Sequence, residues 1–526
     1  MKLKIIILIL FFFLLLMPAL LRLTGKDVEQ QENRIKAKAP VFSTEVLLKQ
    51  NYYDDFNKYF NDNFSMRGYY IFAKNWIDFN AFSTSPSYNN VHIGKKGWLY
   101  YLPEMKDFFG EACDEEASVD RLVLQLHALE SVLRASGKTF YFMVAPNKST
   151  IYPEFVGYTP GKNNCDKSKL NIVLDRFSVN PLNGFIRLDE QLMKEKAGNP
   201  SVLLYYKTDT HWNWHGAKIA SEMILERVSS DVSDNVSHKH FQPSVEFHET
   251  SYVGDLVKLL GLENIVELAD RVNFPNPSAT SEKKAYLLSN GLYIEHFTLD
   301  RTVGVPSLPS AVFYGDSFLD RITDYVKGAF SKIDVIPSQH TIPTKEDIED
   351  LSSYRIVLFE VVERELNHVI ININKVVSAL RSSIHPSRIH SLNLQTIKTN
   401  PYAYLQFNRA GVAVISDTHM PEIMIPSVPA SNNTTFKLIK LSIESPKSEG
   451  EIQIYFNSNE NARQHERLRV GLQDIYFILP YGDKVSAFIK LNKTHGAFNL
   501  HGIKILEFDS KMKLSHYSSV MSRANL

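Results

Sequence analysis

The stretch YYKTDTHWNWHGAKIA, residues 205–220, contains the end of an apolar run, a polar corner and the start of a helical pattern. The run VLLYY, Val202–Tyr206, is short and apolar and predicts a buried strand. Asn213 is a favoured N-cap, and apolar residues recur behind it at helical spacing, which predicts a helix from about Trp214 to Val228. A strand that runs into a helix through a short loop is typical of α/β domains.

The same alternation recurs along the middle of the chain. Ser118–Ser136 has apolar residues at helical spacing and ends at Gly137, which predicts a helix. Buried strands are predicted in TFYFMVA, Thr139–Ala145, in SAVFYGDSF, Ser310–Phe318, and in YRIVLFEVVE, Tyr354–Glu363. Such alternation indicates a parallel sheet covered by helices on both faces. The active crevice of such a sheet lies at the carboxyl ends of its strands.

Polar residues with matching chemistry lie at these strand ends. Asp209 and His211 are two apart, so in an extended segment both side chains face the same side. Ser317 closes the sequence YGDS, in which Gly315 permits a sharp turn that can raise the hydroxyl above the sheet. A serine hydroxyl is a weak nucleophile that needs a base, and the base needs an orienting partner. The spacing therefore predicts a triad of Ser317, His211 and Asp209.

Donors to the oxyanion are also predicted at the strand ends. The backbone N–H of Ser317 is one candidate, and the side-chain amide of Asn147 or Asn213 is another. Lys148 follows Asn147 in the sequence APNKST at the end of a predicted strand. For Trp212 and Trp214, packing in the core is favoured over a platform for a sugar ring, which is the alternative role.

Neither a metal site nor a cofactor is predicted. His211 and His215 are four apart, but His211 lies before the predicted helix, so the two rings do not share a helical face. The chain has two cysteines, Cys113 and Cys165, in polar segments that look like loops. If the protein is exported, one disulfide between them is expected, and two unrelated thiols are the alternative.

Composition excludes several classes of protein. The chain has 526 residues, 44% of them hydrophobic and 22% charged, which fits a globular protein of two or three domains. Its 58 basic and 58 acidic residues give a formal net charge of zero, and no long basic stripe occurs, which argues against nucleic-acid binding. Ile5–Leu21 is an unbroken apolar run just long enough to span a bilayer. We expect an uncleaved membrane anchor, with a cleaved signal segment as the alternative.

Changes of composition divide the chain into four parts. Residues 1–26 are the anchor or signal segment, and residues 27–84 are a polar tether followed by amphipathic helices. Residues 85–385 form the predicted α/β catalytic domain, beginning with a hairpin at VHIGKKGWLYY, Val91–Tyr101. From 386 to 526, short strands separated by Asn, Gly, Ser and Pro turns predict an all-β sandwich.

Five motifs in chain order carry a family resemblance: IGKKGWLYY, APNKSTIYPE, TDTHWN, GDSF and FEVVEREL. Over about residues 40–385 the sequence resembles the SGNH-hydrolase-like O-acetyltransferases of bacterial alginate and exopolysaccharide biosynthesis. The resemblance implies a three-layer α/β sandwich and maps the family's triad onto Asp209, His211 and Ser317. It implies a periplasmic enzyme, held at the inner membrane, that passes acetyl groups to a polysaccharide acceptor. The acetyl donor would be delivered by a multispanning membrane acyltransferase partner.

The last motif contributes further candidates. Glu363 and Arg364 either line the cleft or form an ion pair that holds a loop. Some family members carry a carbohydrate-binding β-sandwich, which is compatible with residues 386–526. The predicted oxyanion and substrate-binding residues are Gly315, Asn147, Lys148, Asn213, Trp212, Arg364 and Tyr314.

Two other functions remain open at the level of sequence. A polysaccharide acetyl esterase would use the same triad, with water in place of the sugar hydroxyl. A non-catalytic glycan-binding assembly protein would have no need of the triad, yet Asp209, His211 and Ser317 are all present. An acetyltransferase is the leading prediction.

Overall fold

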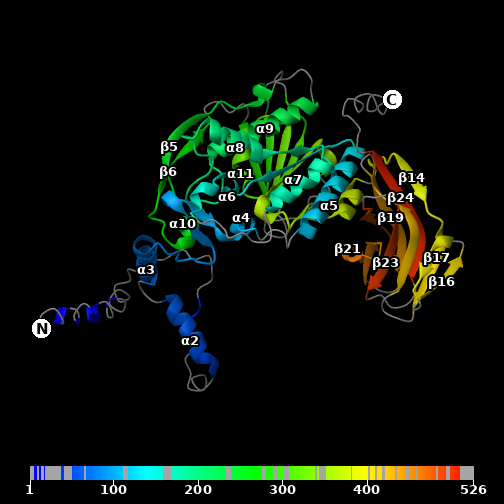
Figure 1. Cartoon of the computed structure of the whole chain (residues 1–526), viewed down its shortest axis with the longest axis horizontal. Helices are drawn as coiled ribbons and strands as arrows, with labels where there is room; N and C mark the ends of the chain where they lie inside the picture. Colours follow the sequence, from blue (N-terminus) through cyan, green and yellow to red (C-terminus); the bar gives the residue numbers. More distant parts are fainter. Residues whose placement is uncertain are drawn as a thin grey trace.

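The computed structural model describes most of the chain as an α/β domain followed by a β-sandwich (Figure 1). Besides isolated positions near the N-terminus, the described residues are 37–40, 50–63, 67–110, 116–157, 167–232, 238–274, 280–287, 293–300, 307–337, 341–342, 351–380, 382–400, 403–408, 411–416, 421–432, 435–445, 450–457, 459–480, 484–492 and 498–509. The helices are α2 (Gln50–Asn63), α3 (Arg67–Phe82), α4 (Met105–Phe108), α5 (Glu116–Ala135), α6 (Lys148–Ile151), α7 (Lys169–Val179), α8 (Leu188–Gly198), α9 (Trp214–Val232), α10 (Asp255–Leu260), α11 (Leu319–Val326) and α12 (Ile373–Ala379).

The centre of the α/β domain is a seven-stranded sheet with the order β4-β3-β12-β9-β10-β8-β7. Five neighbouring strands are parallel, and β8 and β7 add an antiparallel pair at one edge. The bounds are β4 (Phe185–Ile186), β3 (Thr139–Ala145), β12 (Ile356–Val362), β9 (Ala311–Gly315), β10 (Lys332–Pro337), β8 (Tyr293–Asp300) and β7 (Thr280–Leu287). The predicted parallel sheet is therefore confirmed, and three of its strands were identified from their apolar runs.

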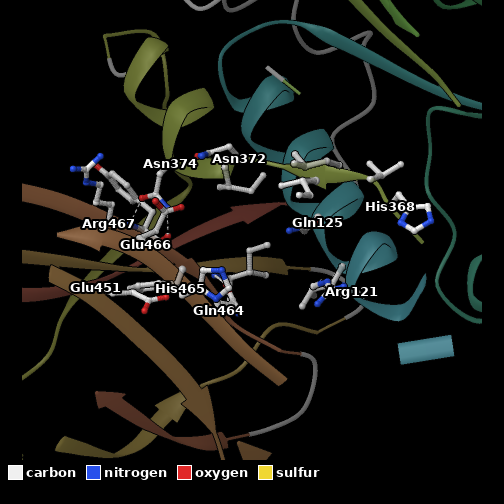
Figure 2. Close-up of a pocket in the computed structure, with 18 of the residues that line it drawn as sticks. Arg121, Gln125, His368, Asn372, Asn374, Glu451, Gln464, His465, Glu466 and Arg467 are labelled. Atoms are coloured by element: carbon white, nitrogen blue, oxygen red, sulfur yellow. Dashed lines mark hydrogen bonds between the residues drawn. The ribbon is translucent and has the colours of Figure 1, made fainter. Parts of the chain in front are cut away.

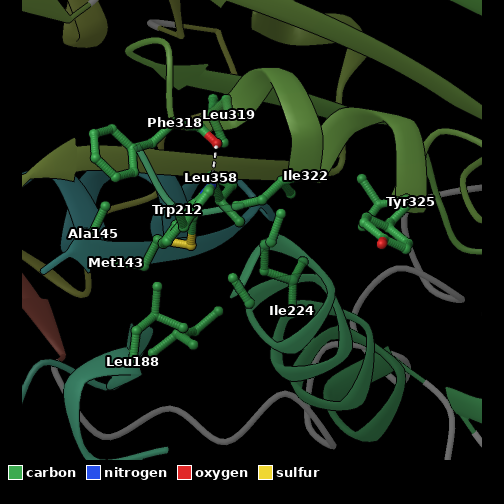
Figure 3. Packing of buried hydrophobic residues seen from close by; sticks show 14 of the residues in the cluster. Met143, Ala145, Leu188, Trp212, Ile224, Phe318, Leu319, Ile322, Tyr325 and Leu358 are labelled. Atoms are coloured by element: carbon green, nitrogen blue, oxygen red, sulfur yellow. Dashed lines mark hydrogen bonds between the residues drawn. The ribbon is translucent and has the colours of Figure 1, made fainter. Parts of the chain in front are cut away.

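Helices cover both faces of this sheet, as the three-layer prediction requires. One buried apolar cluster joins the sheet to α8, α9 and α11, and another joins the opposite face to α5, α7 and α12. Figure 3 shows part of the first cluster, in which Trp212 and Phe318 lie together with Met143 and Leu358 of the sheet. The two residues that follow His211 and Ser317 are thus anchored in one core, which fixes the positions of the catalytic candidates.

The predicted strand at Val202–Tyr206 is wrong. This segment is a loop whose backbone groups bond to nearby loops: Tyr206 N–H donates to His211 O, and Asn213 N–H donates to Leu204 O. Tyr205 makes only an isolated bridge to Trp212. The run is apolar because its side chains are buried, and burial alone does not distinguish a strand from a packed loop.

Smaller elements surround the sheet. The predicted hairpin is confirmed as β1 (Val91–Ile93) and β2 (Leu99–Tyr101). A second hairpin pairs β5 (Glu246–Tyr252) with β6 (Glu267–Asn273), and α10 lies in the connection between them. A short parallel pair joins β11 (Thr341–Ile342) to β13 (Ile370–Ile371).

The N-terminal anchor and the disulfide fall on parts of the chain that are not described. Among the described residues, no helix is long and apolar enough to cross a membrane. Most of Ile5–Leu21 lies outside those residues, as do Cys113 and Cys165. The anchor and the disulfide remain predictions.

The C-terminal part is a sandwich of two antiparallel sheets (Figure 1). One sheet has the order β16-β17-β24-β19-β22, with β14 beside β24, and the other has the order β15-β18-β23-β20-β21. The bounds are β14 (Arg388–Ser391), β15 (Lys398–Thr399), β16 (Ala403–Asn408), β17 (Gly411–Ser416), β18 (Glu422–Pro429), β19 (Thr435–Ser445), β20 (Gly450–Phe456), β21 (Asn459–Leu468), β22 (Gly471–Ile478), β23 (Lys484–Asn492) and β24 (Phe498–Asp509). The facing apolar residues form a core of their own.

The two domains share buried apolar surface. Leu438, Tyr476 and Phe508 of the sandwich belong to the same cluster as α5 and α12. Asn374 of α12 also bonds to the edge strand β22, accepting from Tyr476 N–H at 2.5 Å and donating to Tyr476 O at 2.8 Å. The sandwich is therefore packed firmly against one helical layer of the α/β domain.

Candidate active site

Ser317, His211 and Asp209 form one hydrogen-bonded line at the carboxyl edge of the sheet. The Ser317 hydroxyl lies 2.7 Å from His211 Nε2, and His211 Nδ1 lies 2.7 Å from Asp209 Oδ1. An ionised carboxylate only accepts hydrogen bonds, so His211 Nδ1 carries the proton and Nε2 is left to accept from Ser317. Ser317 is exposed to solvent, while Asp209 is buried. This is the geometry that a serine nucleophile, its base and an orienting carboxylate require.

Asp209 is held in the ionised form by several donors. Tyr252 Oη donates to Asp209 Oδ2 at 2.7 Å, and the backbone N–H of Asp255 donates to the same oxygen at 2.9 Å. The backbone N–H of His211 donates to Oδ1 at 2.9 Å. Burial by itself raises the pKa of the Asp209 carboxyl, but the hydrogen bonds and charge of His211, together with Tyr252, outweigh burial and hold that pKa well below its usual range.

Asp255 supports the same loop and was not identified from the sequence. Its carboxylate accepts from the Thr210 N–H at 2.8 Å and from the Thr210 hydroxyl at 2.5 Å. Asp209, His211 and Asp255 have ligand atoms within 4.8 Å of one another, so their chemistry is compatible with a cation. Both nitrogens of His211 already face Asp209 and Ser317, and that arrangement suits a triad better than a metal site.

The turn that presents Ser317 is fixed by the half-buried carboxyl group of Asp316 and the buried carboxyl group of Glu360. Asp316 accepts from the N–H of Phe318 and from the N–H of Val362, each at 2.9 Å. The N–H of Asp316 donates to Glu360 Oε2 at 3.0 Å. A Cβ at Gly315 would lie 2.6 Å from that Glu360 oxygen and 2.4 Å from Leu319 Cδ1. Gly315 therefore lets the turn lie directly on the Glu360 carboxyl. Lack of space for a side chain, in addition to the sharp turn expected from the sequence, explains why a glycine stands at this position.

Glu360 differs from Asp209 in its protonation. It is 1% exposed, and burial followed by the nearby charge of Asp316 raises the pKa of the Glu360 carboxyl well above its usual range. The raised pKa favours the neutral form of Glu360, and the Asp316 carboxyl accepts from two backbone N–H groups. Glu360 lies within the predicted strand Tyr354–Glu363 and within the motif FEVVEREL, but the sequence did not indicate its contact with the turn.

Lys148 stabilises the loop that carries His211. Its ammonium group donates to the carbonyl of Asp209 at 2.6 Å, of Lys207 at 3.2 Å and of Tyr206 at 3.3 Å. It is completely buried, and burial lowers the pKa of Lys148 to about 8. The predicted contact with substrate is not supported, because all three donors of this side chain are used within the protein.

The other amides and Trp212 also hold the framework. Asn147 is fully buried, and its N–H donates to Glu363 Oε2 at 2.9 Å. Asn213 caps α9, where its oxygen accepts from the N–H of His215 at 2.9 Å. Trp212 is 0% exposed, and its indole N–H donates to Phe318 O at 3.2 Å (Figure 3). Trp212 is thus a core residue rather than a sugar platform, and neither amide faces an oxyanion at Ser317.

Tyr314 is a core residue as well. It is 1% exposed and belongs to the apolar cluster on the side of the sheet that α5 covers. The predicted role in substrate binding is not supported, because almost none of its surface can reach a ligand. The backbone N–H of Ser317 remains a candidate oxyanion donor, since it donates to no acceptor among the described residues.

Arg364 packs on two rings and pairs with a buried acid other than Glu363. Its guanidinium lies over the rings of Tyr101 and Phe318, at 5.6 and 5.7 Å from their centroids. Its Nη1 lies 3.8 Å from Glu104 Oε2 and has no hydrogen-bond partner among the described residues. Glu104 is fully buried, and burial, partly offset by Arg364, raises its pKa to about 7. Arg364 thus pairs with a buried acid and lies beside the residue that follows the nucleophile.

The comparisons with known proteins find similarity over part of the chain. Residues 91–293 match the family model described as the SGNH hydrolase-like domain of the acetyltransferase AlgX, a range that includes Asp209 and His211 and ends before Ser317. The chain is 26% identical over 198 residues to a probable alginate O-acetylase AlgJ of Pseudomonas fluorescens, covering 37% of this chain and 46% of the relative. The chain thus spans about half the length of the curated relatives that it matches.

Solved structures give more distant similarities. The O-acetyltransferase domain of Pseudomonas putida AlgJ is similar at 16% identity with a TM-score of 0.38, covering 56% of this chain and 99% of that chain. Pseudomonas aeruginosa AlgX is similar at 13% identity with a TM-score of 0.35, covering 80% of this chain and 94% of that chain. Residues 91–293 are thus similar to the SGNH hydrolase-like domain of the acetyltransferase AlgX, and the chain is similar to AlgJ over 198 residues.

Proposed function

We propose that the protein is an O-acetyltransferase that adds acetyl groups to the hydroxyls of a bacterial exopolysaccharide through an acyl-enzyme on Ser317. The observation that carries this proposal is the continuous line from the exposed Ser317 hydroxyl through His211 to the buried Asp209. The relatives named alginate O-acetylase support the choice of acetyl as the group and of a polysaccharide as the acceptor.

In the first half-reaction, His211 Nε2 takes the proton of the Ser317 hydroxyl while Oγ attacks the acetyl carbonyl. The donor's leaving group departs with the proton from His211, and the acetyl group stays on Ser317. Asp209 keeps the imidazole in the required tautomer and stabilises its charged form. The negative charge on the carbonyl oxygen is stabilised by the Ser317 N–H.

In the second half-reaction, a sugar hydroxyl takes the place of the leaving group. His211 accepts the hydroxyl proton as the sugar oxygen attacks the acyl-enzyme, and Ser317 then regains its proton from His211. We place this chemistry in the periplasm, with the N-terminal apolar run holding the enzyme at the inner membrane. A multispanning membrane acyltransferase is the proposed source of the acetyl group.

Acyl transfer from p-nitrophenyl acetate tests the mechanism. The purified chain should release p-nitrophenol, and mass spectrometry should find an acetyl group on Ser317. Ser317→Ala should abolish both signals, while Ser178→Ala, an exposed serine on α7, should leave them unchanged. Full release by Ser317→Ala would overturn the proposal. With polysaccharide present, acetylated sugar supports transfer, whereas free acetate alone would indicate an esterase.

A further inference from the structure

An arginine outside the triad contacts the side chain that supports Asp209. Arg321 Nη2 lies 3.4 Å from Tyr252 Oη, and that hydroxyl donates to Asp209 Oδ2 at 2.7 Å. The guanidinium also lies over the rings of Tyr206 and Trp214, at 5.0 and 5.7 Å from their centroids. A single side chain, Tyr252, therefore separates Arg321 from the carboxylate of the triad.

Arg321 connects the two segments that carry the triad. It lies four residues after Ser317, on α11. Tyr206 and Trp214 stand on either side of the loop that carries Asp209. The helix that follows the nucleophile is thus joined to the loop of the orienting carboxylate by a second route, besides the direct hydrogen bond between nucleophile and base.

The contacts of Arg321 fix both the ring and the hydroxyl of Tyr252. The rings of Tyr252 and Tyr206 are stacked, with centroids 4.1 Å apart and an interplanar angle of 19°. Arg321 Nε is buried and has no hydrogen-bond partner among the described residues, so the ring faces help to stabilise the charge. Burial by itself lowers the pKa of Arg321, but Tyr206, Tyr252 and Asp209 outweigh burial and raise that pKa.

The direction of the hydrogen bonds follows from the chemistry of the three groups. A guanidinium can only donate, and an ionised carboxylate can only accept. The Tyr252 hydroxyl therefore accepts from Arg321 and gives its one proton to Asp209. Hydrogen bonds in a chain polarise one another, so the charge of Arg321 makes this hydroxyl a stronger donor. The bond to Oδ2 leaves Oδ1 of Asp209 directed at His211 Nδ1.

We propose that Arg321 is a positioning residue of the acyl-transfer reaction, which acts through Tyr252 to hold Asp209 in line with His211. The inference rests on the proposed function, because it assigns a further residue to the same triad. It differs from a role in packing alone, since the effect of Arg321 on turnover must depend on the Tyr252 hydroxyl.

Substitutions of Arg321 test whether its charge and donors matter. Arg321→Met keeps much of the length of the side chain without donors, so kcat for p-nitrophenyl acetate should fall about fivefold with KM unchanged. Arg321→Lys keeps a charged donor and should restore kcat to within about twofold of the wild type. Arg121→Met should keep the wild-type kcat, because Arg121 lies on α5, at the opposite face of the sheet and beside the cavity between the two domains (Figure 2). A wild-type kcat in Arg321→Met, or the same loss with lysine as with methionine, would overturn the inference.

A double-mutant cycle tests whether the arginine acts through the tyrosine. Tyr252→Phe alone should lower kcat about tenfold, and adding Arg321→Met should lower kcat no further. Independent effects would multiply to a loss of about fiftyfold, and that result would contradict the inference. Circular dichroism checks that each variant is folded. Arg321→Gln, which has a neutral polar head group, replaces Arg321→Met in the cycle if the methionine variant does not fold.

Sulfonylation of Ser317 separates this inference from the proposed function. Phenylmethylsulfonyl fluoride reacts with an activated serine, whose oxygen replaces the fluoride, and the reaction needs neither an acetyl donor nor a sugar. Mass spectrometry should find Ser317 modified about fivefold more slowly in Arg321→Met than in the wild type. That difference supports the inference even if the wild type transfers no acetyl group to polysaccharide. Equal rates in the two proteins, or no reaction in either, overturn it.

Discussion

The His211 loop and the nucleophile turn are each held by a buried carboxyl group, and the pKa values of these two groups are shifted in opposite directions. In the loop, Asp209 accepts from Tyr252 and from the Asp255 N–H, and it stays ionised. In the turn, burial and then the nearby Asp316 raise the pKa of Glu360. Both carboxyl groups are almost fully buried, so burial alone does not decide the direction in which the pKa is shifted. The number of donors and the nearest charge decide it.

The largest effect on turnover is expected from Asp209→Asn. The amide can donate to His211 and favour the wrong tautomer, so kcat for ester hydrolysis should fall roughly 10³–10⁴-fold. Stopped-flow release of p-nitrophenol measures this loss. Asp270→Asn is the control, because Asp270 also pairs with a histidine, His215, that has no place in the triad. A loss under tenfold for Asp209→Asn would show that its charge is not needed.

A smaller effect is expected from Tyr252→Phe. Losing this donor should raise the pKa of Asp209 and lower stability near pH 7 by about 1–3 kcal/mol. The depressed pKa of Asp209 stabilises the fold at pH values above the pKa that this carboxyl has in the unfolded chain, and this stabilisation is lost as pH falls. The variant has less of this stabilisation, so its unfolding in acid should begin at a higher pH than that of the wild type. Acid titration followed by circular dichroism tests this shift. Tyr53→Phe, on the exposed face of α2, should titrate like the wild type.

Glu360→Gln should be milder still and sharpens the contrast with Asp209. A neutral glutamine keeps an oxygen for the Asp316 N–H, so kcat should fall by no more than about threefold. Glu360→Ala should instead lower the free energy of unfolding by about 2–4 kcal/mol, because it leaves a cavity and an unpaired N–H. Chemical denaturation and ester hydrolysis measure the two quantities. If Glu360→Gln lost as much activity as Asp209→Asn, Glu360 would have to be ionised in the working enzyme.

The smallest effect on turnover is expected from Glu104→Gln, whose signal is in the pH dependence of stability. Burial raises the pKa of Glu104 to about 7. The contribution of Glu104 to the free energy of unfolding is therefore complete below the pKa that this carboxyl has in the unfolded chain, and it is lost as pH rises toward 7. The glutamine should remove this decline, and ester hydrolysis at pH 6 should stay near the wild-type rate. Urea denaturation at a series of pH values measures the slope. An unchanged slope between about pH 4.5 and 7 would mean that Glu104 is already ionised there.

The sequence predicted the residues that stand at strand ends and missed those that support them. Ser317 and the pair Asp209 and His211 were identifiable because each lies in a short polar segment next to an apolar run. Tyr252 and Asp255 come from the β5 hairpin and its connection, more than forty residues after Asp209, and only the fold brings them together.

The errors have physical causes too. Val202–Tyr206 was predicted as a strand because its side chains are apolar, but its backbone bonds to neighbouring loops instead of the sheet. β10 was missed because Asp334 interrupts its apolar pattern, and that carboxylate is buried against the Tyr354 hydroxyl. Lys148 looked like a ligand for substrate, whereas its ammonium holds the carbonyl of Asp209. Pattern shows where polar groups lie along the chain and not which way they point.

The shared core between the two domains constrains how this architecture can be inherited. If the two domains were separated, Phe436, Leu438 and Tyr476 of the sandwich would be exposed to solvent. The helices α5 and α12 of the α/β domain would lose the apolar side chains that cover them. Asn374 would lose the backbone groups of β22 that it bonds. Recombination could exchange the sandwich only for a module with a matching edge strand and apolar face. The two domains are therefore expected to have diverged as a single cooperative unit, with their substitutions at this interface coupled.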